Sequence, residues 1–330
     1  MQTATTAQSA SSQRSVTVPI LSVVVPVYNE VETLPHMHER LTQVLQQMGF
    51  PYEIILVNDG SKDGSLHLMT EMSARDTHVK VVDFSRNFGH QAAITAGMAQ
   101  SIGSAVVIID ADLQDPPEVI PQMMDQWRAG AEIVYAQRIE RRGETIFKLL
   151  TANIFYRLLR RITAVDIPRN TGDFRLLDRR AVNAINALPE RHRFMRGLAA
   201  WVGFRQVAVQ YKRQERFAGT TKYPLSKMIR FALEAITGFS YFPLQLATTF
   251  GFISAALSLV GIVVAILLRV VWHEIVGEAT TLILVLFLGG IQLIFLGVLG
   301  EYLGRIYDEV RARPLYIVRN VIGQTPTEEQ

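Results

Sequence analysis

Two aspartates directly follow an apolar run of the chain. Ala105–Ile109 has the composition of a buried strand, Asp110 and Asp112 stand at its end, and Gln114 comes two residues later. In α/β sheets the carboxyl ends of the strands open into the crevice where ligands bind. Two carboxylates and an amide oxygen suit Mg²⁺ or Mn²⁺, whose other ligands are water and substrate phosphates. The spacing therefore predicts a site for a metal ion and a diphosphate.

An acidic turn is the alternative for this segment, with Asp115 capping a helix that begins near Pro117. Two further polar clusters favour the metal site. They follow the first and second predicted strands, at Tyr28-Asn29-Glu30 and Asn58-Asp59. Three polar clusters at one edge of a sheet would frame a crevice large enough for a nucleotide.

The composition narrows the classes of protein. The chain has 330 residues, a formal net charge of +3 and no cysteine. The lack of cysteine excludes disulfides, thiolate metal sites and a cysteine nucleophile. The nearly balanced charge gives no indication of nucleic acid binding.

Buried strands alternate with helical patterns in the first two thirds of the chain. The predicted strands are Ile20–Val27, Glu53–Val57, Val79–Phe84, Ala105–Ile109 and Glu132–Ala136. This alternation predicts an α/β domain with an open, mainly parallel, doubly wound sheet. We assign the domain to residues 19–215, after a disordered tail at 1–18.

Two long uncharged stretches near the C-terminus predict membrane helices. No charged residue lies between positions 234 and 269, or between 278 and 301. Each stretch exceeds the ~20 apolar residues that cross a bilayer. We therefore expect two transmembrane helices within 242–300, at Pro243–Val270 and Ala279–Gly300, joined as a hairpin. A buried helical hairpin in a large soluble core is the alternative.

The surroundings of this hairpin predict its orientation. Basic residues flank it on both sides, and the connector at 271–278 has none. The positive-inside rule then places the domain and both termini, including a tail at 301–330, in the cytoplasm at the inner or plasma membrane. Residues 145–163 and 225–239 resemble interfacial helices, with packing on the sheet as the alternative. We assign 216–241 to an acceptor loop and the second of these helices.

Several motifs, taken in order, resemble those of family 2 glycosyltransferases. They are Val25–Glu30, Asn58–Ser61, Phe84–His90, Asp110–Glu118, Gly172–Leu176 and Arg216–Tyr223. The chain is most similar to the branch that glycosylates polyprenyl phosphates, namely bactoprenol glucosyltransferases and dolichol-phosphate mannosyltransferases. The resemblance covers about residues 20–320 and implies a GT-A, Rossmann-like domain. It departs from the family at Asn58 and Asn170, where relatives often carry Asp.

The resemblance implies a site for the nucleotide of a nucleotide sugar. The implied nucleotide-binding residues are Pro26, Tyr28, Glu30, Asp59 and Asp110. A tyrosine ring can stack on a base, and a carboxylate can accept from a base N–H or a ribose hydroxyl. An exposed strand-end aromatic is the alternative for Tyr28, and an Asx-turn in the Gly60 loop is the alternative for Asp59.

The family pattern also supports the metal ligands Asp110, Asp112 and Gln114, with a solvent-exposed amide as the alternative for Gln114. The bound Mg²⁺ or Mn²⁺ would neutralise the leaving diphosphate. Asn87–His90 begins a helix whose N–H groups are suited to the sugar or the phosphates. Asn87 acting only as a helix cap is the alternative.

A lipid phosphate acceptor makes cations necessary near the site of attack. Its second pKa lies near ~6, so the attacking oxygen is already anionic and needs positioning more than deprotonation. We expect Arg138 in a catalytic role, with a solvated charged face as the alternative. Acceptor or diphosphate binding is expected from the remaining set: Arg141, Arg142, Lys148, Arg216, Lys222 and Tyr223.

Asp173 matches the position that the family treats as a base or as a carboxylate orienting the acceptor. Because the nucleophile is already ionised, orientation is the favoured role. A salt bridge from Asp173 to Arg175 or Arg179 is the structural alternative.

These features predict an inverting, metal-dependent hexosyltransferase at the cytosolic membrane face. It would move a hexose, with glucose from UDP-glucose favoured, onto undecaprenyl or another polyprenyl phosphate. A GDP-mannose-dependent mannosyltransferase and a non-catalytic membrane scaffold are the alternatives. Small residues in the second span, including Gly289, Gly290, Gly297 and Gly300, predict a homo-oligomer such as a tetramer.

Overall fold

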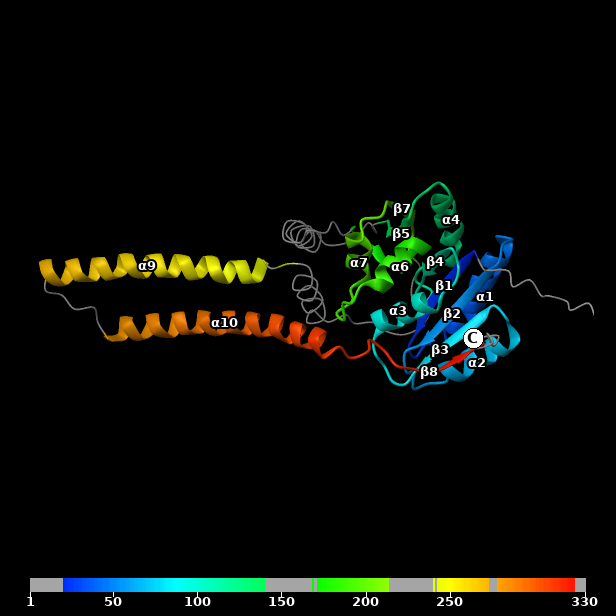
Figure 1. The fold of residues 1–330 in the computed structure, drawn as a ribbon, viewed down its shortest axis with the longest axis horizontal. Helices are drawn as coiled ribbons and strands as arrows, with labels where there is room; N and C mark the ends of the chain where they lie inside the picture. Colours follow the sequence, from blue (N-terminus) through cyan, green and yellow to red (C-terminus); the bar gives the residue numbers. More distant parts are fainter. Residues whose placement is uncertain are drawn as a thin grey trace, which may run out of the picture.

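The computed structural model describes residues 20–139, 168, 171–213, 240, 242–272 and 278–323. An eight-stranded sheet forms the centre of the domain, with the strand order β7-β5-β6-β4-β1-β2-β3-β8 (Figure 1). The strands are β1 (Leu21–Val27), β2 (Tyr52–Asn58), β3 (Val79–Phe84), β4 (Ala105–Ile108), β5 (Ile133–Arg138), β6 (Thr171–Asp178), β7 (Gln206–Tyr211) and β8 (Val318–Ile322).

Helices cover both faces of this sheet. They are α1 (Leu34–Gln47), α2 (Ser65–Arg75), α3 (His90–Gln100), the 3₁₀ turn η1 (Pro117–Val119), α4 (Ile120–Arg128), α6 (Arg179–Ala187) and α7 (Met195–Trp201). One hydrophobic cluster joins α1, α2 and α4 to the sheet, and a second joins α3, α6 and α7 to it. The predicted doubly wound α/β architecture is therefore confirmed.

The β-branched composition of the central strands explains their position. β1 and β2 are buried along their whole length, as expected for parallel strands covered on both faces. β1 pairs in parallel with β2 and β4, and β2 pairs in parallel with β3. The carboxyl ends of these four strands consequently lie at one edge of the sheet.

Three strands lie outside the sequence prediction. β6 is antiparallel between β4 and β5, β7 pairs in parallel with β5, and β8 pairs antiparallel with β3. The apolar pattern of the sequence does not predict β6, because its buried residues include Asp173 and Arg175. The antiparallel direction of β6 matters for function, since its amino end meets the carboxyl ends of its neighbours.

The C-terminal helices are α9 (Phe242–Trp272) and α10 (Glu278–Arg311), which project side by side from one end of the domain (Figure 1). Both are long and apolar enough to cross a membrane, over Phe242–Val264 and Leu284–Arg311, and the most apolar 18-residue stretch of each is unburied. α10 continues to Arg311, beyond the predicted end at Gly300. The segment predicted as a tail at 301–330 therefore contains the last turns of α10 and the edge strand β8.

Polar contacts tie the end of α10 to the domain. The backbone N–H of Arg191 donates to Oε1 of Glu309 at 2.8 Å, and Nε2 of His192 lies 3.2 Å from Oδ2 of Asp308. Earlier in α10, the buried Tyr302 hydroxyl donates to the carbonyl of Ser240, which comes just before α9, at 2.6 Å. These contacts fix where the domain sits relative to α10.

Several predictions lie outside the described residues, namely the tail at 1–18 and the interfacial helices at 145–163 and 225–239. The glycines of α10 that the oligomer prediction uses are within the described part. No other group lies within 4 Å of a Cβ built on Gly289, Gly290, Gly297 or Gly300. The oligomer stays a prediction.

Candidate active site

The sheet brings the predicted site residues to a single edge. In the β4–β6 ladder, Ile108 is opposite Arg175. Because the strands are antiparallel, two steps past Ile108 on β4 correspond to two steps before Arg175 on β6. Asp110 and Asp173, which are 63 positions apart in the sequence, are thereby brought to the same place.

His90 connects these two aspartates. Its Nε2 atom lies 3.3 Å from Oδ2 of Asp173 and 3.5 Å from Oδ1 of Asp110. Asp173 also accepts from Nε of Arg196 at 3.0 Å and from Nε2 of Gln91 at 3.2 Å. The result is a cluster in which a buried Asp173 and a partly exposed Asp110 share a histidine, and Asp173 is further held by an arginine and an amide.

Asp173 is stabilised in its charged form. Burial alone would raise its pKa, but the hydrogen bond with His90 and the charges of Arg196 and Arg175 hold the pKa well below its usual range. Partial desolvation of the ring would by itself lower the pKa of His90, but its contacts with Asp173 and Asp110 raise it. Asp173 is therefore a weak proton acceptor at neutral pH. The alternative salt bridges are only partly present, because Arg175 lies 4.0 Å away and Arg179 instead donates to the carbonyl of Gly103.

Asp110 has the opposite electrostatic character. Burial, together with the charges of Asp173, Asp115 and Asp112, raises its pKa to about 6, although the nearby His90 opposes the shift. Its Oδ1 atom is buried without a hydrogen-bond partner among the described residues. A buried carboxylate oxygen in an excess of negative charge favours the approach of a cation.

The donor set fits one divalent ion shared with a substrate. Asp112 is buried, and its Oδ1 accepts from the backbone N–H of Gln114 at 3.1 Å. Within the described residues, no group of three His, Asp or Glu side chains is arranged to hold a metal alone. Mg²⁺ and Mn²⁺ commonly take one or two carboxylates and complete their shell with phosphate oxygens and water, so Asp110 and Asp112 suffice.

Gln114, the predicted third ligand, is already engaged. Its Oε1 accepts a hydrogen bond from Nη2 of Arg213, a residue beyond the end of β7. A ligand role for Gln114 stays a prediction and requires this contact to open. The acidic-turn alternative is wrong in its detail, since the residue that caps η1 is Pro116 rather than Asp115.

Asp115 pairs instead with Arg138, the predicted catalytic arginine. Oδ1 of Asp115 lies 3.6 Å from Nη2 of Arg138 and accepts from the hydroxyl of Tyr211, which in turn accepts from Nε of Arg138 at 3.0 Å. Burial and the charge of Asp115 raise the pKa of Tyr211, so the phenol remains a donor. A Cβ at Gly172 would lie 2.8 Å from Nη2 of Arg138, so a side chain there would displace this guanidinium. Arg138 thus has a fixed position next to the metal-binding segment.

The predicted nucleotide residues lie on the loops after β1 and β2. Pro26 is buried in β1, whereas Tyr28 is 45 % exposed and presents its ring at the surface. Glu30 accepts from the hydroxyl of Thr33 at 2.7 Å. Hydrogen bonds join the loops, among them those from the Asn29 N–H to Ser61 at 3.1 Å and from the Lys62 N–H to Asn29 at 2.8 Å.

Asp59 fixes a third loop. Its carboxylate accepts from the backbone N–H groups of Phe88 at 2.7 Å and Gly89 at 3.0 Å. Burial raises the pKa of Asp59, and these two donors oppose the shift. The predicted alternative of an Asx-turn is not what the carboxylate forms, and the helix cap is Gly89 rather than Asn87. The N–H groups predicted to face the sugar or phosphates therefore bind Asp59 at these two positions.

Six predicted residues lie outside the described part of the chain: Arg141, Arg142, Lys148, Arg216, Lys222 and Tyr223. Conversely, the prediction omitted residues that complete the site, namely His90, Gln91, Asp115, Arg196 and Tyr211. His90 and Asp115 belong to motifs already identified, so the sequence could have predicted that they lie near the site. Arg196 and Tyr211 lie in segments without such a motif.

The fold is that of an α/β domain with a carboxylate-rich sheet edge, and the comparisons with known proteins establish its family. The model of glycosyl transferase family 2 matches residues 22–185. The chain belongs to this family and is a glycosyltransferase, as predicted.

Relatives match over almost the whole chain. The uncharacterized glycosyltransferase YkcC of Bacillus subtilis (strain 168) is 50 % identical, over 92 % of this chain and 94 % of its own. The bactoprenol glucosyl transferase of Shigella phage SfV is 43 % identical, over 91 % of this chain and 98 % of its own. Among solved structures, glucosyl-3-phosphoglycerate synthase from Mycobacterium tuberculosis matches with a TM-score of 0.45 and 20 % identity, over 66 % of this chain and 78 % of its own.

Proposed function

We propose that this protein transfers a hexose from a nucleoside diphosphate sugar to a polyprenyl phosphate at the cytosolic face of the membrane. Glucose from UDP-glucose is the proposed donor, undecaprenyl phosphate is the proposed acceptor, and the anomeric centre is inverted. The observation that carries the proposal is the convergence of Asp110, Asp112 and Asp173 at the sheet edge of a domain attached to two membrane-length helices. The bactoprenol glucosyl transferase relatives support the choice of sugar and lipid.

The properties of Asp173 fit an acceptor that needs no deprotonation. A phosphate monoester has a second pKa near ~6, so it is largely a dianion at neutral pH. Its oxygen forms the new bond to the anomeric carbon while the bond to the diphosphate breaks, and direct displacement inverts that centre. Asp173, ionised and held by Arg196 and His90, orients this network and takes no proton.

Positive groups must accompany the incoming phosphate. His90 with its raised pKa and Arg196 offset the negative charge of Asp173 at the site. Arg138, held by Asp115 and Tyr211, presents a guanidinium of the kind that binds phosphate oxygens in pairs. These cations bind and orient the anionic reactants.

Asp110 and Asp112 would hold Mg²⁺ or Mn²⁺, which neutralises charge on the departing nucleoside diphosphate when bound. The raised pKa of Asp110 supports this role, because a divalent ion relieves the crowding of carboxylates. The membrane helices keep the lipid close to a domain that works in water. The basic residues flanking the helices support a cytosolic domain, and the glycines of α10 support a homo-oligomer.

The test is a transfer assay with the purified full chain in nanodiscs. Wild-type protein with UDP-[¹⁴C]glucose, undecaprenyl phosphate and Mg²⁺ should label the lipid, and EDTA should abolish the labelling. Asp112→Ala should also abolish labelling while leaving the amount of membrane protein unchanged. Asp125→Asn is the matched control. Asp125 is exposed on α4, and its ion pair is a long, solvent-exposed contact of 3.8 Å with Arg128, so its loss should not change activity.

The same assay separates the rival functions. Labelling from GDP-mannose but not UDP-glucose would replace the proposed donor by that of a mannosyltransferase. An absence of transfer from any nucleotide sugar would indicate a scaffold. Full activity in EDTA would contradict the metal role of Asp110 and Asp112.

A further inference from the structure

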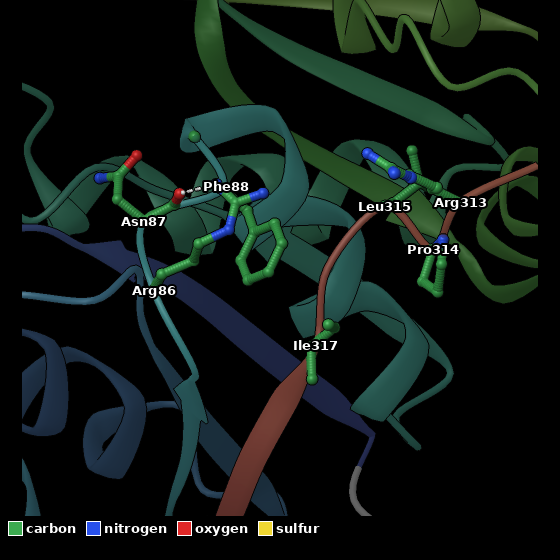
Figure 2. A pocket seen from close by; sticks show the side chains of 8 residues that line it. Arg86, Asn87, Phe88, Arg313, Pro314, Leu315 and Ile317 are labelled. Carbon is green, nitrogen blue, oxygen red and sulfur yellow. Dashed lines mark hydrogen bonds between the residues drawn. The ribbon is translucent and has the colours of Figure 1, made fainter. Parts of the chain in front are cut away.

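A pocket separate from the carboxylate cluster lies between the loop after β3 and the segment that follows α10 (Figure 2). Its volume is about 620 Å³. The lining combines two arginines with apolar side chains: Arg86, Asn87, Phe88, Gly89, Arg313, Pro314, Leu315 and Ile317. None of the lining residues is acidic. Arg86 donates to the backbone carbonyl of Asn87 at 3.0 Å, and its charge also acts on Asp59.

The two walls of this pocket are fixed to each other. The backbone N–H of Ser85 donates to the carbonyl of Ile317 at 3.0 Å. Tyr316 stacks on Phe84 with the ring centroids 5.1 Å apart, and Phe84 meets the edge of Phe88 at 5.7 Å. The guanidinium of Arg86 lies 4.1 Å from the centre of the Phe88 ring (Figure 2). The pocket is therefore preformed in the absence of a ligand.

An exposed apolar stripe on α10 ends beside the pocket. Leu299, Leu303, Ile306 and Val310 recur at three- and four-residue intervals, and their exposed fractions are 45, 56, 57 and 78 %. Such spacing places them on one face of the helix. The stripe continues past Glu301, where the uncharged run ends, and Arg313 comes three residues after Val310.

The stripe lies along the part of α10 that separates the uncharged run from the pocket. From Glu301 to Arg311 the helix rises about 15 Å at 1.5 Å per residue, so the pocket is well beyond the end of the uncharged run. A lipid phosphate that reaches this height must draw part of its isoprenoid chain out of the bilayer. A continuous apolar helix face replaces the contacts that the chain loses there.

We propose that this pocket binds the phosphate end of an isoprenoid phosphate, with Arg86 and Arg313 on the phosphate and the first isoprene units along the α10 stripe. The inference rests on the proposed function and adds an entry site for its acceptor. Two guanidinium groups suit a phosphate dianion, and the apolar lining suits the adjoining hydrocarbon. The hydrogen bond from Arg86 to Asn87 uses Nη1, which leaves its other N–H groups for a ligand. A lipid headgroup and a free phosphate share this chemistry, but only the lipid also uses the stripe.

The pocket is also connected to the reacting groups. Phe88 and Gly89, which line it, are the residues whose N–H groups bind Asp59. The next residue is His90, which contacts Asp173 and Asp110. A ligand in the pocket would therefore contact the loop after β3, which leads directly to His90.

The test uses the full chain in phosphatidylcholine nanodiscs, with KM for undecaprenyl phosphate and kcat measured at saturating UDP-glucose. Arg313→Gln and Arg86→Gln should each raise the acceptor KM about tenfold and leave the donor KM unchanged. Arg311→Gln is the matched control, because it removes the same charge two residues away and outside the lining; its KM should stay within twofold. Binding of undecaprenyl phosphate without donor should weaken in parallel.

Two further arms identify the ligand. With soluble geranyl phosphate, Arg313→Gln should again raise KM, whereas Ile306→Ser should raise KM for the long acceptor only. Inorganic phosphate should compete weakly, and equal competition by phosphate and lipid would overturn the lipid assignment. A change in oligomeric mass with Ile306→Ser would show that a second copy covers the stripe and would overturn its role as a lipid path.

The possible failures are distinct. Wild-type transfer to undecaprenyl phosphate with unchanged KM and binding in both arginine variants overturns the pocket alone. An equal effect of Arg311→Gln also overturns it, because general membrane electrostatics would then explain the loss. Wild-type protein that transfers nothing to a polyprenyl phosphate overturns the proposed function itself.

Discussion

Asp59 and Asp110 follow strands of the same sheet and differ in how their carboxylates are satisfied. Asp59 is nearly fully buried, and backbone N–H groups of the neighbouring loop occupy its oxygens. Asp110 is partly exposed, and within the described residues its buried Oδ1 has no hydrogen bond and only a 3.5 Å contact with His90. Its pKa is raised to about 6. A satisfied carboxylate holds structure, whereas an unsatisfied one in negative surroundings is available to a ligand.

The same contrast applies to the two arginines near the site. Arg138 is held by Asp115 and Tyr211, while Arg313 lies exposed in a pocket without acidic lining. Asp59 and Asp110 were predicted together as nucleotide ligands, Arg138 was predicted as catalytic, and Arg313 was not predicted as a ligand. The structure separates them into residues held by protein contacts and residues open to a ligand. The variants below separate the two classes.

The largest effect is expected from Asp110→Asn. We expect kcat/KM to fall at least 100-fold, about 2.7 kcal/mol of transition-state stabilisation, because a charged metal ligand is lost. The melting temperature should not decrease, since the substitution also removes a carboxylate from a crowded negative cluster. Kinetics and thermal unfolding of the same preparation provide the check. A lower melting temperature with activity retained would show that Asp110, like Asp59, has a structural role.

Asp59→Ala should have the opposite profile. The substitution leaves the N–H groups of Phe88 and Gly89 without their acceptor, at a cost of about 1–3 kcal/mol in the free energy of unfolding. Because the loop also leads to His90, a smaller loss of activity should accompany it. Denaturant unfolding measures the first effect, and unchanged stability together with a large rise in donor KM would make Asp59 a direct ligand instead.

Gly60→Ala tests the contact between the same loops. Gly60 has φ +66°, and a Cβ there would lie 2.4 Å from the backbone nitrogen of Asn87. We expect a loss of about 1–3 kcal/mol, since neither the backbone conformation nor the space admits a side chain. Gly49→Ala is the control, with a similar φ of +69° and no atom within 4 Å of the Cβ. Equal stability losses in both variants would show that the positive φ, and not the close contact with Asn87, accounts for the effect.

The smallest effect is expected from Tyr211→Phe. It deletes one buried hydroxyl that bridges Asp115 and Arg138, and we expect about 1 kcal/mol in unfolding and a several-fold fall in kcat. Arg138→Gln should be more severe in kcat if this guanidinium reaches the reactants. Comparable kcat values for the two variants would limit Arg138 to a structural role.

Much of the sheet was predictable because its central strands are continuous apolar runs. β1 to β5 appear within one or two residues of the predicted bounds. β6 was not predictable in the same way, since its buried Asp173 and Arg175 interrupt the apolar pattern and depend on partners from other elements. β8 is a short edge strand in a segment that has the composition of a tail.

The sequence by itself determined the family, the paired aspartates after β4 and the two membrane-length helices, because local composition and motif order carry that information. Only the tertiary structure decided which carboxylates are free, because each depends on a distant partner. Asp59 binds a loop about 30 residues away, Asp173 binds Arg196, and Asp115 binds Tyr211. The pocket at Arg313 likewise exists only because β8 brings the end of the chain back to β3.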